Sequence, residues 1–170
     1  VRSARRGIDE GGAGAVGHYA VQMASQLGAA RVLTSVSTPE KAALARAAGA
    51  DDVVMYKTEP LVERVAELTA GRGVDRIIEL DLGVNAAADF EMLRRGGECM
   101  VYGSSTTSVQ LPFVPLIAKN LQLKFFIVYH LSPQDRAVAA GTLTRMLERG
   151  MLQHNIAARM QLDEIAAAHE

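Results

Sequence analysis

Residue types that mark specialised classes of protein are scarce in this chain. Its 170 residues include one cysteine and no tryptophan, and aromatic residues make up 5% of it. A single cysteine excludes a disulfide framework and a cysteine-rich zinc site. The four histidines, at positions 18, 130, 154 and 169, are scattered without ligand spacing. We therefore expect no metal site.

The chain also lacks an excess of charge of one sign and a long apolar run. Its 18 Lys and Arg residues balance 19 Asp and Glu residues, for a net charge of -1, and no basic stripe with stacking aromatics points to nucleic acid. No apolar run is long enough to span a membrane, and residues 1–6 lack the apolar core of a signal peptide. We therefore expect a cytoplasmic chain with no membrane or nucleic-acid partner.

What the chain does contain is a glycine-rich turn that runs into a helix. Apolar residues recur at three- and four-residue spacing over 16–27 and predict the helix. Before it, Gly12, Gly14 and Gly17 form the pattern G-x-G-x-x-G, which suits a tight turn, close approach of a pyrophosphate and close packing of helix on sheet. The free N–H groups at the helix start, at Ala15 and Val16, would then face the phosphates. Taken alone, the pattern fits a flexible glycine loop before an ordinary helix equally well.

Predicted strands and helices alternate after this turn. Apolar and β-branched runs predict strands at 31–36, 52–56, 74–80, 99–102 and 121–129. Helices are predicted at 38–48, 60–71, 85–93, 133–149 and 162–169, with a loop and short turn at the prolines of 112–115. Alternation of this kind predicts an α/β fold, a doubly wound and mostly parallel sheet with ligands at the carboxyl ends of its strands. It favours a Rossmann-type dinucleotide site, with Cys99 as a small core residue of a central strand.

The first ten residues fit this fold poorly. A dinucleotide-binding sheet needs a buried strand just before the glycine turn, yet residues 1–10 contain three arginines and the pair Asp9-Glu10. Ile8 is the only large apolar residue near the turn, so the segment predicts a degraded central strand. We therefore separate an atypical segment, 1–10, from a cofactor-binding domain, 11–170.

The end of the second strand predicts which dinucleotide is bound. NAD-binding folds place an acidic residue there, about 20 residues after the glycines, to hold the ribose hydroxyls. Here the strand ends in Ser35-Val36-Ser37, without an acid, and Lys41 follows one helical turn later. A missing acid beside a cation favours the 2′-phosphate of NADP(H), although a lysine at such a position is more often an ordinary solvated residue.

Several stretches together resemble the cofactor domain of medium-chain dehydrogenase/reductases, and among them the quinone oxidoreductases of the zeta-crystallin type. The matching stretches fall in the expected order and cover nearly the whole chain: Gly11–Gly17, Ala47–Asp51, Gly71–Asp75, Arg95–Gly97 and Ala166–Glu170. The resemblance implies an NADPH-dependent oxidoreductase that passes a hydride to a quinone or an activated alkene, without zinc.

The resemblance also implies roles for residues outside the glycine turn. In this family a small residue, a lysine and a tyrosine hold the 2′-phosphate, and Ser37, Lys41 and Tyr56 occupy those places. Other positions would pass along the ribose, the pyrophosphate and the nicotinamide, namely Leu80, Gly103, Ser104, Phe126 and Val128. Hydride transfer depends on positioning and on exclusion of water more than on an acid or base, and we assign no catalytic residue.

Two parts of the family's pattern are not found in this sequence. These are the N-terminal catalytic domain, which forms the other wall of the substrate cleft, and the final strand, expected just after Glu170. We therefore do not predict catalysis by this chain alone. The alternatives are a truncated, non-catalytic nucleotide-binding fragment and an enoyl reductase of the same superfamily. A methyltransferase shares a glycine turn but usually has an acid at the end of the second strand.

The apolar segment 121–129 predicts self-association. In the strand order 3-2-1-4-5-6 it is the sixth strand, at an edge of the sheet, and Lys124 is its only charge. An exposed edge is a template for another strand, and the family it resembles pairs this strand with its copy across a two-fold axis. We expect a homodimer joined through 121–129, with cover by residues 150–170 as the alternative.

Overall fold

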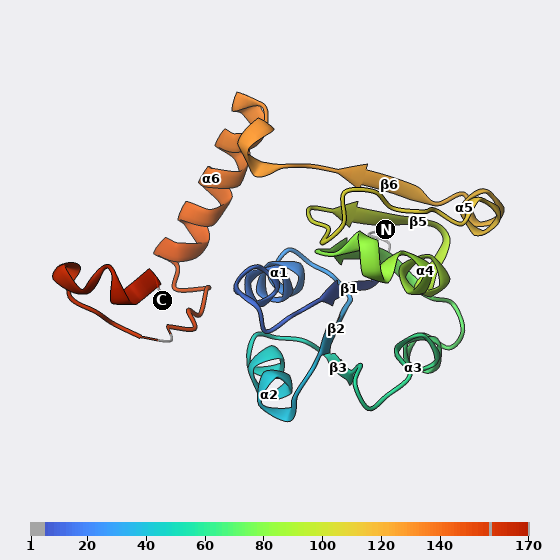
Figure 1. Ribbon diagram of the computed structural model, residues 1–170, viewed down its shortest axis with the longest axis horizontal. Coiled ribbons are helices and arrows are strands. Elements are labelled where there is room, and N and C mark those ends of the chain that lie inside the picture. The colour runs from blue at the N-terminus through green and yellow to red at the C-terminus, as the bar shows by residue number, and fades with distance from the viewer. Residues whose placement is uncertain (1–5, 157, 170) are drawn as a thin grey trace.

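The computed structural model describes residues 6–156 and 158–169, and it contains one parallel sheet flanked by helices (Figure 1). The strands lie in the order β3-β2-β1-β4-β5-β6. Their bounds are β1 Arg6–Glu10, β2 Arg31–Val36, β3 Asp52–Met55, β4 Val74–Glu79, β5 Leu93–Val101 and β6 Gln122–Phe125. All neighbouring strands pair in parallel, which confirms the predicted doubly wound α/β fold.

Helices cover the two faces of the sheet. Figure 1 shows α1 and α2 on one side of the strands and α3 and α4 on the other, as right-handed crossovers require. Their bounds are α1 Ala15–Gln26, α2 Pro39–Ala47, α3 Leu61–Leu68, α4 Leu82–Met92, α5 Phe113–Lys119 and α6 Pro133–Glu148. The switch in strand order falls between β1 and β4, where ligands bind in folds of this kind. Within the described residues, no helix is both long and apolar enough to cross a membrane.

The described part of the atypical first segment forms the central strand. Residues 6–10 pair with β2 along their whole length, and Gly7–Asp9 pair with β4. The expectation of a degraded strand is therefore wrong for the backbone of residues 6–10, while residues 1–5 lie outside the described part. Pairing on both sides satisfies the strand's backbone groups, so tertiary context outweighs its weak β propensity.

The main core lies between α4 and the sheet. Ile77 of β4 and Cys99 of β5 belong to the same buried cluster as Phe90 of α4, which is 1% exposed. Cys99 is a buried thiol in β5, which confirms its predicted place in the core. The core therefore fixes α4 and the turn before it against β4 and β5, beside the switch point.

Several predicted bounds are wrong at their ends. The strand expected at 121–129 ends at Phe125, because its partner β5 ends at Val101. Phe126 N–H still donates to Val101 O at 3.2 Å, and a 3₁₀ turn follows at Val128–His130. The helix expected at 162–169 is two 3₁₀ turns, Leu162–Glu164 and Ala167–His169. The other corrections are α5 in place of a short turn after Pro112, a start at Leu82 for the helix expected at 85–93, and a start at Leu93 for β5.

Candidate functional site

The glycine turn joins the end of β1 to the start of α1. Gly11 has a φ of +98°, a left-handed conformation that glycine adopts without strain. A Cβ on Gly12 would overlap the buried Thr34 Oγ1, so the turn lies close against β2. Gly14 is the N-cap and offers no side-chain cap, and the first turn of α1 has no acidic residue. The first N–H groups of α1, beside the exposed Ala15 and Val16, are thus available to an anion.

The predicted 2′-phosphate residues follow the ends of β2 and β3. These strand ends are paired, since Val36 lies opposite Met55 and Tyr56 N–H donates to Val36 O at 3.2 Å. Ser37 is half-buried, whereas Lys41 and Tyr56 are exposed. Lys41 lies in the first turn of α2, where its N–H donates to the capping Thr38 Oγ1 at 3.3 Å. The fold therefore gathers Ser37, Lys41 and Tyr56 at one end of two neighbouring strands.

One acidic residue near this position escaped the sequence reasoning. Glu40 lies one residue before Lys41, in the first turn of α2. Its own backbone N–H and the Thr38 side chain hydrogen-bond the carboxylate and lower the pKa of Glu40. The carboxylate therefore serves the helix start, where a negative charge is favourable, rather than the end of β2.

The turn between β4 and α4 brings Leu80 against two glycines. A Cβ on Gly11 would lie 2.8 Å from Leu80 Cδ2, and a Cβ on Gly103 would overlap Leu80 O. Leu82 N–H also donates to Gly103 O at 3.3 Å. The turns after β1, β4 and β5 therefore meet at the switch point, which groups the predicted Leu80 and Gly103 with the glycine turn.

The loop after β5 is tied to the same turn. Ser105 donates from its N–H and its hydroxyl to Asp81 Oδ1, at 2.8 and 3.0 Å. These bonds hold the pKa of Asp81 below its ordinary value. Asp81 thus stays ionised at neutral pH and fixes the loop that begins with the exposed Ser104.

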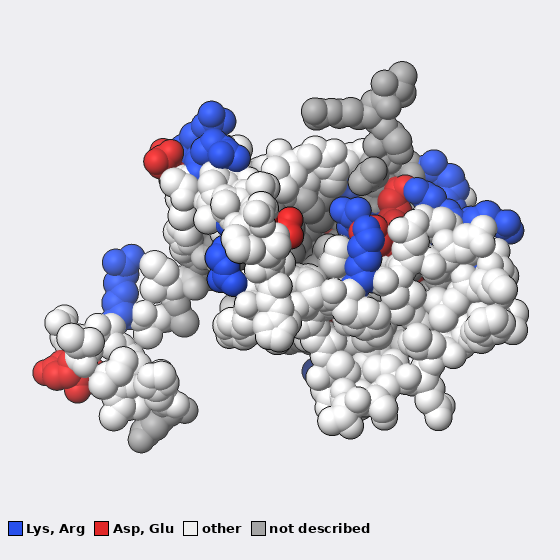
Figure 2. Space-filling view, turned by 90° about the horizontal axis from the view of Figure 1, so that it is seen from above, with Lys and Arg blue, Asp and Glu red and all other residues white. Residues whose placement is uncertain are grey.

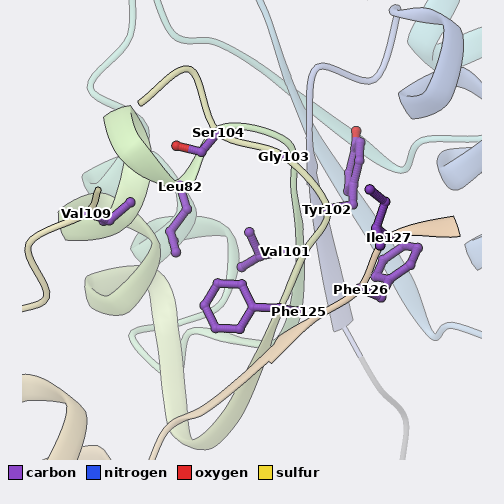
Figure 3. A pocket seen from close by; sticks show the side chains of 9 residues that line it. All are labelled: Leu82, Val101, Tyr102, Gly103, Ser104, Val109, Phe125, Phe126 and Ile127. Carbon is purple, nitrogen blue, oxygen red and sulfur yellow. The ribbon is translucent and has the colours of Figure 1, made fainter. Parts of the chain in front are cut away.

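A cavity of about 410 Å³ opens at the carboxyl ends of β5 and β6. In Figure 3 the side chains of Leu82, Val101 and Phe125 converge on one side, while Tyr102, Phe126 and Ile127 lie on the other. The Tyr102 and Phe126 ring centroids are 6.3 Å apart, at a tilt of 41°. The walls are almost wholly apolar and are completed by Gly103, Ser104 and Val109. The cavity can pack against a flat, largely apolar group and shield that side of it from water.

The cavity includes only some of the residues predicted to lie along the ribose, the pyrophosphate and the nicotinamide. Gly103, Ser104 and Phe126 line it, but Val128 lies outside it in the following 3₁₀ turn and is 51% exposed. Sequence reasoning missed Tyr102 and Phe125, although their positions at strand ends were a usable signal. Val109 comes from an irregular loop, for which the sequence holds no such signal.

The described histidines do not gather into a metal site. His18 is buried and hydrogen-bonds Gln153 O through Nε2 at 2.9 Å, and Tyr19 Oη lies 2.7 Å from His154 Nδ1. These contacts attach the segment after α6 to α1. Among the described residues, no group of three or more His, Cys, Asp or Glu is placed to hold a metal ion.

The fold and this site define a nucleotide-binding domain of the dehydrogenase type. The profile of the zinc-binding dehydrogenase family matches residues 15–145, and the chain belongs to that family. Its relatives include a 2-haloacrylate reductase from Burkholderia sp, 31% identical over 164 residues, and quinone oxidoreductase 1 from Escherichia coli K12, 29% identical over 167 residues. Each alignment covers 93% of this chain, but 49% and 50% of those proteins.

Solved structures of quinone oxidoreductases and related proteins also superpose on this chain. A mycobacterial protein complexed with NADPH superposes with a TM-score of 0.84 at 28% identity, covering 99% of this chain and 54% of that one. The Escherichia coli quinone oxidoreductase complexed with NADPH gives 0.80 at 27% identity, covering 92% and 49%. These matches confirm the resemblance to quinone oxidoreductases of the medium-chain superfamily. The chain spans about half the length of the curated relatives it matches.

Proposed function

We propose that this chain is the NADP(H)-binding domain, residues 11–170 together with the central strand β1 that precedes them, of an oxidoreductase that passes a hydride from NADPH to a quinone or an activated alkene. The observation that carries the proposal is the cluster of Ser37, Lys41 and Tyr56 beside an end of β2 that has no carboxylate. A 2′-phosphate there would gain a cation and hydroxyl donors. A ribose diol of NADH would lack its usual acidic partner.

The rest of the site suits the other parts of the cofactor. The uncapped start of α1 would bind the pyrophosphate through N–H groups and the helix dipole. The exposed Leu80 and the loop at Gly103–Ser104 lead from there to the apolar cavity. When bound, NADPH would supply the hydride, and the chain's own residues would orient the nicotinamide and keep water away from it. No side chain is assigned as an acid or base.

The two acceptor classes share one chemical feature. Quinones and haloacrylates both contain an electron-poor C=C bond conjugated to a carbonyl group, which makes both of them hydride acceptors, and the names of the relatives contain both. The apolar walls formed by Val101, Phe125 and Phe126 suit such flat acceptors. An enoyl reductase would use the same hydride chemistry, and a non-catalytic fragment would bind the nucleotide without turnover.

Calorimetric titration of the chain with NADPH and with NADH tests this proposal. NADPH should bind at least about tenfold more tightly, as one charge-assisted contact to the 2′-phosphate provides. Equal binding, or tighter binding of NADH, would contradict it.

We also propose that the chain forms a homodimer through the outer edge of β6. Phe125, Ile127 and Tyr129 are 65%, 50% and 78% exposed. Lys124 is paired with Glu98 at 2.7 Å, so it protects the edge less than a free lysine would. Figure 2 looks onto this side of the molecule, where broad uncharged areas lie between clusters of charged side chains. The dimer would pair 122–125, a shorter strand than the sequence predicts.

Phe125→Lys should shift the chain from dimer to monomer in sedimentation velocity, because a charged residue on an edge strand opposes strand addition. Proline at Ile127 is a weaker probe, since that residue lies beyond β6. Val138→Lys, on the exposed face of α6, is the matched control and should leave the dimer intact. A parent chain that stays monomeric at high micromolar concentration rules the dimer out.

A further inference from the structure

Two neighbouring carboxyl groups are buried where α4 packs on the sheet. Glu79 is the last residue of β4 and Asp89 lies in α4, and both residues are 0% exposed. Burial of one ionised carboxylate in an apolar core is costly, and two neighbouring carboxylates cannot readily both carry a charge. No described feature of the proposed cofactor chemistry uses either group, so their presence needs another reason.

The hydrogen bonds of Glu79 reach both the following turn and α4. Its Oε1 accepts from the backbone N–H of Asp81, and from Asn85 Nδ2 at 3.0 Å. Asp89 hydrogen-bonds the same carboxyl, and Cys99 Sγ lies 3.9 Å from Asp89 Oδ2. A carboxylate has no proton to donate. A hydrogen bond between Glu79 and Asp89 therefore requires that one of them is protonated.

The turn that Glu79 holds lies at the proposed site. Asp81 N–H is bound by Glu79, and the preceding residue, Leu80, lies between Gly11 and Gly103. The side chain of Asp81 in turn fixes Ser105 in the loop after β5. Glu79 thus supports, through Asp81, the place where the turns after β1, β4 and β5 meet, but it is not itself one of the site residues.

We propose that Glu79 is a positioning residue, which shares one proton with Asp89 and holds the Leu80–Asp81 turn between the glycine turn and Gly103. The effect on cofactor binding rests on the proposed function, whereas the shared proton does not. The pair would make both the stability of the domain and the shape of the turn depend on pH.

The pKa of Glu79 supports this arrangement. Burial has the largest effect and raises the pKa. The hydrogen bonds from Asp81 N–H, Asn85 and Asp89 lower this pKa, and the charge of Asp81 raises it further. Among described side chains, the titratable groups facing the pair are Asp81 from the turn and Cys99 from β5. An unfolded Glu79 titrates near 4.5. Between that pH and the folded pKa the folded chain holds one proton more than the unfolded chain, so its stability falls as pH rises across this interval.

Unfolding in urea from pH 5 to 8 tests the shared proton. The unfolding equilibrium constant of the parent chain should rise relative to that of Glu79→Gln by up to about tenfold per pH unit, the factor for one proton. Asp89→Asn should remove the slope in the same way, because either amide donates to the remaining carboxylate. Glu63→Gln, an exposed acid of α3, should keep the parent's slope. A slope that Glu79→Gln and Asp89→Asn leave unchanged would overturn the proposal.

Calorimetric titration with NADPH at pH 7 tests the positioning role. Glu79→Ala leaves Asp81 N–H and Asn85 without their acceptor and should raise the NADPH dissociation constant at least about tenfold. Glu79→Gln keeps an acceptor oxygen and should restore most of that loss. Equal affinities for the parent and Glu79→Ala, both folded, would overturn the role. A parent that binds no NADPH would refute the proposed function, while the pH slope would still decide whether the proton is shared.

Discussion

Gly103→Ala should destabilise the chain by on the order of 3 kcal/mol, the upper part of the range for overpacked sites. The new Cβ would overlap Leu80 O, and a backbone atom cannot relieve the overlap by a change of rotamer as a side chain can. Relief requires movement of the β4–α4 turn, and with it Leu80 and its contact with Gly11. Thermal unfolding should show a fall in the midpoint of about 10 °C for a domain of this size.

Gly141→Ala is the matched control for this substitution. Gly141 lies inside α6, where a Cβ would meet only the flexible end of Arg145, at 3.4 Å. Alanine there should stabilise the helix by about 1 kcal/mol. The same change should therefore raise the midpoint at one glycine and lower it at the other. An unchanged midpoint for Gly103→Ala would mean that the three turns are not packed together as described.

Lys41→Ala should weaken NADPH binding roughly 10- to 100-fold and leave NADH binding unchanged, because a charge-assisted contact to the 2′-phosphate is lost. Arg46→Ala removes the same charge from the last turn of the same helix, and it should change NADPH affinity little. Calorimetric titration of each variant with both dinucleotides gives the comparison. Equal losses for the two variants would point to a general effect of charge, and equal losses for NADPH and NADH would exclude a 2′-phosphate contact by Lys41.

The glycine turn and the strand order could be predicted from the sequence because they depend on local signals. Gly12, Gly14 and Gly17 each serve a backbone requirement that other residues meet poorly, and apolar periodicity marks α1 and the strands that follow. The family resemblance pointed to Ser37, Lys41 and Tyr56, and parallel strands that end at one edge of the sheet place them near the same ends of β2 and β3.

Other features depend on contacts that a local sequence does not encode. β1 forms because β2 and β4 pair with both of its edges, and β6 stops where β5 stops, although the apolar run continues to Tyr129. Val109 reaches the cavity from an irregular loop, so it does not follow a strand. Glutamate and aspartate usually lie on the protein surface, and only the packing of α4 on the sheet shows that Glu79 and Asp89 are buried.

The central claim is that the ends of β2 and β3 hold a 2′-phosphate, and adenosine 2′,5′-bisphosphate tests it most directly. This ligand contains adenosine with a 2′-phosphate and a 5′-phosphate but no nicotinamide, so its binding does not depend on the far wall of the substrate cleft. Calorimetry should find that it binds at least about tenfold more tightly than adenosine 5′-monophosphate, and Lys41→Ala should abolish the difference. Equal affinities of the parent chain for the two ligands would contradict the assignment of Ser37, Lys41 and Tyr56.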